Sequence, residues 1–227
     1  KQNTSKYWRT WKMSIATMIL GESGTGKSTS MRNLSPADTL LIQTVKKPLP
    51  FRSKEWKPVS ENGNVLVTDD SHRIIAAMQK TRRKVIVIDD FQYMIANEFM
   101  RRTAERGYDK FTEMALHAWQ VAKIASELPD DVRVYILSHT DTKDDGTIKA
   151  KTIGKLLDEK ITLEGLFSIV LRTGKNDGGY FFRTKNNGSD TVKTPIDLFD
   201  SEAIENDLAK VDAAICEYYE LNQTNAA

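Results

Sequence analysis

The stretch "GESGTGKST", residues 21–29, constrains this chain more than any other feature. Residues 21–28 match the pattern G-x-x-x-x-G-K-[ST] at every specified position. The apolar run "SIATMIL" precedes the pattern and "KSTSMRNL" follows it, which predicts a buried strand over residues 14–20 and then the first turns of a helix. A strand-to-helix turn of this kind surrounds an anion with backbone N–H groups, so we expect a phosphate-binding loop rather than an ordinary glycine-rich turn.

The individual residues of the loop fit that role. Gly21 and Gly26 permit backbone conformations that a side chain would obstruct. Lys27 can reach the β and γ phosphates of a nucleotide, and the Ser28 hydroxyl can ligate magnesium. The other residues expected to contact the nucleotide are Glu22, Ser23, Gly24, Thr25 and Thr29.

Composition limits the class of protein. With 227 residues, 40% hydrophobic and 28% charged, the chain suits a single soluble α/β domain over residues 1–227. No apolar run approaches the roughly 20 residues of a membrane span and no signal peptide is visible; because the chain begins at Lys1, we expect a few native residues to be missing. The single cysteine, Cys216, excludes an internal disulfide and fits a core position in a reducing compartment. A net charge of +2 does not by itself indicate nucleic-acid binding.

Apolar strands alternate with amphipathic helices along the chain. Strands are predicted at 39–43, 84–89 and 132–137, and helices at 71–80 and 109–128, which indicates a mostly parallel sheet with helices on its faces. Residues 44–63 are predicted to be an irregular excursion because they contain Pro48, Pro50 and Pro58. "LFSIVLRT" and "YFFRT" flank the turn "GKNDGG" and predict an antiparallel hairpin. An N-terminal arm over 1–12 and a C-terminal helix over 201–222 complete the expected organisation.

A metal anchor is predicted at the end of the apolar strand in "KVIVIDD". We expect this strand to lie beside the strand of the phosphate loop, so that Asp89 holds magnesium through water. The alternative is an acidic residue that merely ends a strand. Together with the phosphate loop, Asp89 predicts a site for magnesium and a nucleoside triphosphate such as ATP.

Hydrolysis would also need a group that orients the attacking water. Asp90 is the candidate base, although its side chain is shorter than the glutamate found there in many related ATPases, and it could instead cap the helix in "FQYMIANEF". Gln43, at the end of "TLLIQ", could orient water but could not take its proton. His139 follows Ser138 at the end of "VRVYIL", where a γ-phosphate sensor would lie. The alternative is that the two residues are merely polar residues at the end of a strand. His72 and His117 fall on predicted helices and are interpreted as ordinary surface or core residues.

Two basic segments are expected to be loops that follow these strands on the nucleotide face. The first contains Arg101, Arg102, Arg106 and Lys110, and the second contains Lys143, Lys149, Lys151 and Lys155. Either could contact a nucleic-acid backbone, but both also contain acids, so a solvated charged surface is an equal alternative. The N-terminal "KYWRTWK" alternates aromatic and basic residues, which suits either single-strand stacking or edge-strand packing.

The chain resembles a known family over nearly its whole length. The blocks that carry the resemblance are "GESGTGKST", "VIVIDDFQYMIANEFMRR", "GYDKFTEMALHAW", "DVRVYILSHTDT", "TIGKLLDEKITLEGLFSIVLRT" and "FFRTKNNGSDTVKTPIDLF". They resemble the RecA-like P-loop ATPases of bacteriophages that are similar to the Sak-type single-strand annealing and recombination proteins. The phosphate loop is common to many ATPases, whereas the last three blocks are more particular.

The resemblance implies a RecA-like core, ATP with Mg²⁺ as cofactors, and a role on single-stranded DNA in phage recombination or replication. It implies self-association into a ring or filament in the cytoplasm of the bacterial host, with phage single-strand-binding or replication proteins as further partners and no membrane. In such assemblies a basic residue enters the neighbour's site; "RTKNNG" resembles that element and makes Lys185, with Arg183 as second choice, the candidate, while an Asn- and Gly-rich hairpin turn is the alternative.

Two other functions remain open at this stage. RecA-type enzymes usually carry a glutamate after the second strand, and this chain has "LLIQT" there, which favours a nucleotide-gated binding switch with negligible hydrolysis. A P-loop kinase, with the arginines near 101–106 as a lid, is the third possibility. The hairpin and "TKNNGSD" argue against the kinase.

Overall fold

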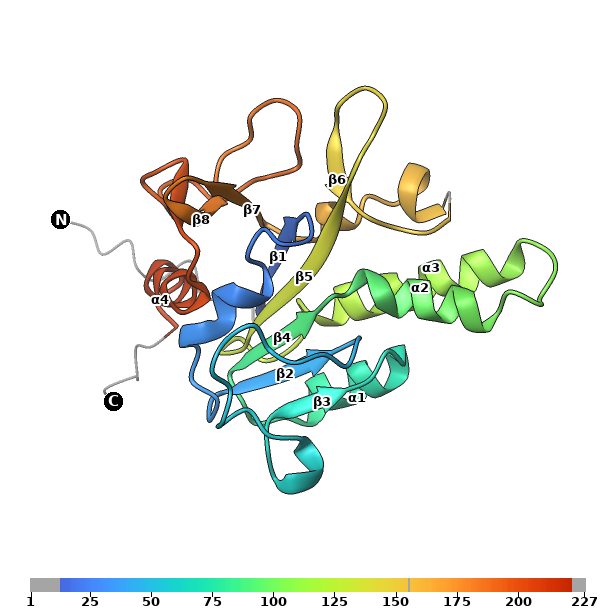
Figure 1. Cartoon of the computed structure of the whole chain (residues 1–227), viewed down its shortest axis with the longest axis horizontal. Helices are drawn as coiled ribbons and strands as arrows, with labels where there is room; N and C mark the ends of the chain where they lie inside the picture. Colours follow the sequence, from blue (N-terminus) through green and yellow to red (C-terminus); the bar gives the residue numbers. More distant parts are fainter. Residues whose placement is uncertain (1–12, 155, 222–227) are drawn as a thin grey trace, which may run out of the picture.

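The computed structural model describes residues 13–154 and 156–221, and within them nine strands form one sheet (Figure 1). The order across the sheet is β3 (Val65–Val67), β2 (Thr39–Gln43), β4 (Val85–Asp89), β5 (Arg133–Thr142), β1 (Ile15–Gly21), β7 (Ile169–Asn176), β8 (Gly179–Arg183) and β9 (Ala203–Glu205). A further strand, β6 (Ile148–Ala150), pairs with the end of β5. The helices are α1 (Ser71–Lys80), α2 (Gln92–Arg101), α3 (Asp109–Ile124) and α4 (Leu208–Tyr218). Short 3-10 helices cover Ser28–Asn33, Val59–Glu61 and Leu163–Leu166, and a π-helical turn covers Leu156–Lys160.

The central strands are parallel. β3, β2, β4, β5, β1 and β7 pair in parallel, whereas β6, β8 and β9 join their neighbours antiparallel. The fold is therefore an α/β fold with a mostly parallel mixed sheet flanked by helices, as the sequence predicted. The predicted hairpin is confirmed as β7 and β8.

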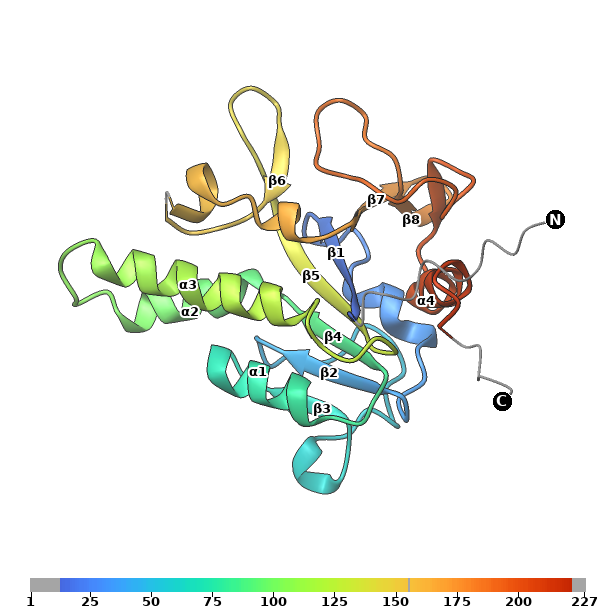
Figure 2. The same cartoon turned by 180° about the vertical axis from the view of Figure 1, so that it is seen from behind.

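Each face of the sheet has its own core. Met18, Ile88 and Ile136 point toward α1, α2 and α3, while Ile19, Val87 and Leu137 point toward the 3-10 helix Ser28–Asn33 and α4. Figure 2, the view from behind, shows α1 and α3 in front of the sheet. Because both faces are covered, the central strands are runs of apolar residues without alternation, which is typical of parallel sheets.

Two predicted helices differ from the structure. The helix after the phosphate loop is a short 3-10 helix, because Ser30 Oγ donates to the Lys27 carbonyl at 2.6 Å and Leu34 is already extended before Pro36. The C-terminal helix does not cover 201–222: Ala203–Glu205 pair with β8 as strand β9, and α4 begins only after Asp207, whose side chain accepts from the Ala209 N–H.

Other elements match their predictions closely. The helix predicted at 71–80 is confirmed as α1. The excursion predicted at 44–63 is irregular except for the short 3-10 helix Val59–Glu61. The helix predicted at 109–128 ends earlier, at Ile124, but its apolar stripe is buried, including Met114, Ala118 and Val121. Cys216 is buried on α4. The N-terminal arm 1–12, with "KYWRTWK", lies outside the described residues, as do Lys155 and residue 222. Among the residues that are described, no helix has both the length and the apolar character needed to cross a membrane.

Candidate functional site

The phosphate loop lines a cavity of about 310 Å³ at the carboxyl end of the parallel strands. Open α/β sheets bind ligands at this end, and the volume lies in the range of small-ligand pockets, about 300–1,000 Å³. The lining residues are Ser23, Gly24, Gly26, Lys27, Ser28 and Thr29 of the loop, with Lys47, Pro48, Pro50, Asp90, His139 and Tyr180 opposite. A larger cavity of about 630 Å³ opens at the amino end of the strands and contains none of the predicted site residues.

Two glycines of the loop are required by close contacts. A Cβ on Gly21 would lie 1.9 Å from Thr173 Oγ1 on β7, because Thr173 reaches over the end of β1 to Thr25, with 2.6 Å between their hydroxyl oxygens. Gly26 has a φ of +95°, and a Cβ there would lie 2.7 Å from the Tyr180 ring. The structure therefore explains both glycines that the sequence singled out.

Lys27 is folded back onto the loop. Its Nζ donates to the Gly21 carbonyl at 2.7 Å and to the Glu22 carbonyl at 2.8 Å, and the residue is 5% exposed. Burial lowers the pKa of Lys27 to about 8, against the opposing effect of the Asp90 and Asp89 carboxylates. The ammonium therefore lies at the floor of the cavity, within reach of an anion placed there.

Ser28 and Asp89 meet directly. The Ser28 hydroxyl donates to both carboxylate oxygens of Asp89, at 2.9 and 3.0 Å. Burial raises the pKa of Asp89 to about 6, and the neighbouring Asp90 carboxylate adds to the rise. The expectation that the Asp89 strand lies beside the loop strand is wrong, because β5 lies between β4 and β1. The contact forms because the chain turns after β1 and brings Ser28 across the end of β5.

Asp90 lies in the cavity wall with its carboxylate engaged. The residue has a φ of +61°, its carboxylate pairs with Lys47, and one carboxylate oxygen lies 3.6 Å from His139 Nε2. Burial acts to raise the pKa of Asp90, but hydrogen bonds from His139 and Lys47 outweigh it and lower the pKa below its ordinary value. The capping alternative is wrong, because no side chain caps α2.

Gln43 and Ser138 lie close to the site but do not line the cavity. The Gln43 amide donates to the Lys47 carbonyl at 3.1 Å. The Ser138 hydroxyl and the His139 backbone N–H both donate to Gln92 Oε1, at 3.4 and 3.1 Å. Gln43 thus supports the segment that contains Lys47, and Gln92 holds the end of β5 so that His139 faces the cavity.

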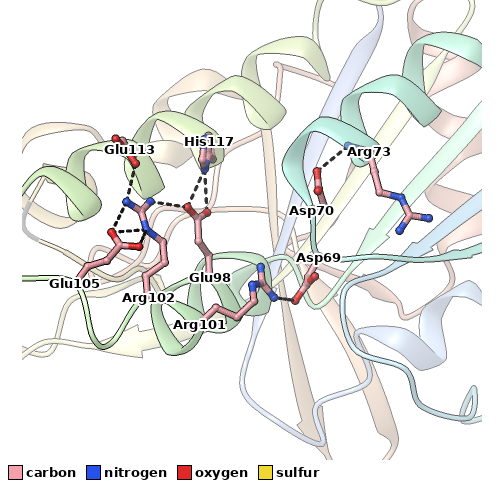
Figure 3. Close-up of polar contacts among 9 residues, drawn as sticks. All are labelled: Asp69, Asp70, Arg73, Glu98, Arg101, Arg102, Glu105, Glu113 and His117. Carbon is pink, nitrogen blue, oxygen red and sulfur yellow. Dashed lines mark hydrogen bonds and ion pairs between the residues drawn. The ribbon is translucent and has the colours of Figure 1, made fainter.

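The first basic segment is not a loop on the nucleotide face. It spans the outer end of α2 and the start of α3, which extend beyond the sheet (Figure 1). Figure 3 shows Arg102 surrounded by Glu98, Glu105 and Glu113, at 3.1, 2.7 and 2.7 Å. His117 Nδ1 contacts Glu98 at 2.9 Å, and Arg101 pairs with Asp69 at 2.6 Å. The ion pairs of this segment link α2 to α3 and to the segment before α1.

The second basic segment and the candidate finger are more open. The hairpin of β5 and β6 rises above the sheet beside the loop that follows β8 (Figure 1), and the Ile148 N–H donates to the Ser189 carbonyl at 2.7 Å. Lys143 pairs with Asp141 at 3.2 Å, and Lys151 is exposed. Lys185 is exposed at the start of the loop after β8, whereas Arg183 is partly buried and its Nε has no hydrogen-bond partner.

Sequence reasoning missed several residues of the site. Lys47 comes from the irregular excursion, where only the pair of lysines before Pro48 signals it. Tyr180 and Thr173 come from the hairpin and gave no signal. Asn206 lies under the loop: it is 2% exposed, its Oδ1 lies 3.1 Å from the position of a Gly26 Cβ, and neither of its amide atoms has a hydrogen-bond partner.

Comparison with protein-family models finds no match, and comparison with curated proteins finds none either.

Proposed function

We propose that the chain is a RecA-like P-loop ATPase that binds ATP with Mg²⁺ and acts on single-stranded DNA in phage recombination or replication. The observation that carries the proposal is the contact of the Ser28 hydroxyl with the Asp89 carboxylate, beside Lys27 and next to a loop-lined cavity. The α/β fold is compatible with a RecA-like core, and the resemblance described above supports the DNA role.

The residues at the floor of the cavity suit a magnesium ion. A hydroxyl and a carboxylate converge there, and Mg²⁺ prefers hard oxygen ligands and keeps several waters besides those of the protein and the phosphates. Within the described part of the chain, no group of three or more His, Cys, Asp and Glu side chains could hold a metal by itself. Ser28 and Asp89 would hold the ion, which would draw charge from the phosphates when bound.

Three further residues of the cavity, Lys27, Lys47 and His139, would contact the phosphates. Lys27 would exchange its two carbonyl partners for phosphate oxygens, which as charged acceptors make stronger hydrogen bonds. Lys47 would add a second cation from the opposite wall, and His139 would contact the terminal phosphate. Because His139 also contacts Asp90, contact with phosphate would alter the Asp90 pair and the end of β5.

A second function, a nucleotide-gated binding switch, is supported by the state of the candidate bases. The Asp90 carboxylate is already paired with Lys47 and His139, and the Gln43 amide is turned to a backbone carbonyl. Neither group is placed to activate water in this conformation. The kinase alternative is weaker, because Arg101 and Arg102 are bound to acids on α2, α3 and the segment before α1 rather than poised over the cavity.

Steady-state hydrolysis of ATP with Mg²⁺ tests the proposal, with and without single-stranded DNA and across protein concentrations that span assembly. We expect DNA to stimulate turnover and the stimulation to rise steeply with protein concentration, because neighbouring subunits would complete one another's sites. Tight ATP binding with negligible turnover under every condition would favour the switch. Consumption of ATP only with a small phosphate acceptor would favour the kinase.

Replacing Lys27 provides the site control for that assay. Lys27→Ala should lower ATP affinity roughly tenfold or more, since a hydrogen bond to a charged group contributes about 1.5–3 kcal/mol. Lys46→Ala is the matched control, because Lys46 precedes Lys47 but does not line the cavity. Normal ATP binding by Lys27→Ala would contradict the assignment of the site.

A further inference from the structure

Tyr180 on β8 stands at the edge of the phosphate-loop cavity. Its Cγ and Cβ lie 2.7 and 2.9 Å from the position that a Cβ on Gly26 would occupy, so the ring packs directly against the loop. The residue is nevertheless 39% exposed, and it lines the cavity together with Lys27 and Ser28. The exposed ring therefore lies next to the loop cavity, with Lys175 Nζ over it at 6.0 Å from the ring centroid.

The same tyrosine lines a second cavity, of about 480 Å³. This cavity lies over β8 and β9, and its other lining residues are Asn176, Gly178, Phe181, Arg183, Glu202, Ala203, Ile204 and Glu205. Tyr180 lines both cavities and is the residue that they share.

The two cavities differ in charge. The loop cavity contains Lys27, Lys47 and His139 against Asp90, whereas the second contains Glu202 and Glu205 against Arg183. Phosphates are therefore attracted to the first cavity, whereas in the second cavity the Glu205 carboxylate is already paired with Arg32 and Lys210. The Glu202 carboxylate and the Asn176 amide oxygen can accept hydrogen bonds from hydroxyl and amino groups. A ligand with a phosphate end and a hydroxyl- and amine-bearing aromatic end is thus oriented in one direction.

We infer that Tyr180 stacks on the base of a bound nucleoside triphosphate and that the cavity over β8 and β9 receives its nucleoside. This inference rests on the proposed function and extends it to the part of the nucleotide beyond the phosphates. An aromatic side chain stacks on the π-face of a base, and every base has such a face. The subsite therefore selects nucleoside triphosphates over inorganic polyphosphate and discriminates weakly between purines.

Equilibrium binding of two probes tests the inference: ATP and inorganic tripolyphosphate, each with Mg²⁺. The wild-type protein should bind ATP more tightly than tripolyphosphate. Tyr180→Leu should weaken ATP binding roughly tenfold, as expected for loss of one stacked base, and should leave tripolyphosphate binding within about twofold. Tyr180→Phe should retain both affinities. Tyr218→Leu is the matched control, because Tyr218 has a similar exposure, 42%, and lies on α4 outside both cavities.

The outcomes separate this inference from the proposed function. If Tyr180→Leu weakens both probes equally, Tyr180 only shapes the loop around Gly26, and the inference is overturned. If ATP and tripolyphosphate bind the wild type and Tyr180→Leu changes neither, the inference is also overturned while the phosphate site stands. If the wild type binds neither probe, the proposed function fails and the inference fails with it.

Photolabelling of the wild-type protein with 8-azido-ATP gives a measurement that does not depend on a variant folding. Trypsin cleaves after Lys175 and Arg183 and after Lys193 and Lys210, which isolates residues 176–183 and 194–210. We expect the label on one of these two peptides, in an amount that excess unlabelled ATP reduces. Specific label only on peptides from α1, α2 or α3 would contradict the inference.

Discussion

At the scale of single residues, two buried asparagines show how differently one side chain can be used. Asn64 and Asn206 are each 2% exposed. Asn64 accepts from the Lys57 N–H at 3.2 Å and donates to the Pro36 carbonyl at 3.0 Å, whereas neither amide atom of Asn206 has a partner. Asn64→Ala should therefore lower the free energy of unfolding by about 1–3 kcal/mol, and Asn206→Ala by clearly less. Urea unfolding measures both, and an equal loss would contradict the contrast.

Asp89 should make the stability of the nucleotide-free protein depend on pH. Burial raises the pKa of Asp89 to about 6 from its ordinary value of 3.8, so the folded state binds the proton more tightly than the unfolded chain does. The contribution of Asp89 to stability then falls as the pH rises through this interval. Asp89→Asn cannot ionise and should melt progressively higher than the wild type between pH 4 and pH 7, with roughly 2–4 °C for each 1 kcal/mol. A melting-temperature difference that is constant across this range would contradict the expectation.

At the scale of elements, the ion pair between Arg133 and Asp212 attaches α4 to the central strand β5 of the sheet. Arg133 on β5 makes two hydrogen bonds to the Asp212 carboxylate, both at 2.9 Å, and the buried Tyr135 hydroxyl donates to the same carboxylate at 2.6 Å. Asp212→Ala should cost about 3 kcal/mol of unfolding free energy, because it leaves a largely buried guanidinium unpaired. Tyr135→Phe should cost less, since Arg133 keeps its partner. The two variants are compared by urea unfolding, and a larger loss for Tyr135→Phe would be inconsistent with this account.

The elements that the sequence predicted are those whose signal is local. The apolar strands of the parallel sheet, α1 and the hairpin of β7 and β8 follow from short runs of residues, and so does the phosphate loop. β9 could not be predicted, because "AIE" by itself resembles the start of a helix. It forms a strand because it pairs with the edge of β8. The position of β5 between β1 and β4 depends on pairing across the whole chain.

The walls of the site were harder to predict than its floor. Lys27, Ser28 and Asp89 belong to motifs with fixed spacing. Lys47 and Tyr180 reach the cavity from an irregular segment and from an antiparallel strand, and both lie opposite the loop only because the sheet folds as it does. The basic residues near Arg102 show the converse. Arg102 pairs with Glu98 and Glu105, which are close in the sequence, and the packing of α2 on α3 adds Glu113.

At the scale of the whole molecule, we expect neighbouring subunits to share sites. Lys185→Ala should lose ATP hydrolysis because its own assembly lacks the basic residue that would enter each neighbouring site. Mixing it with Lys27→Ala should restore part of the activity, since a Lys27→Ala subunit would lend Lys185 to an intact phosphate loop. Hydrolysis is measured across mixing ratios, and activity that stays at the level of the two separate variants would remove the proposed role of Lys185 in a neighbouring site.

If Lys27, Ser28 and Asp89 form a site for ATP with Mg²⁺, calorimetric titration of the wild-type protein with ATP, with and without Mg²⁺, should reveal it. We expect Mg²⁺ to strengthen ATP binding to the wild type, and expect Asp89→Asn to remove most of that strengthening while the protein stays folded. ATP binding that is equally tight with and without Mg²⁺, or unchanged in Asp89→Asn, would contradict the account.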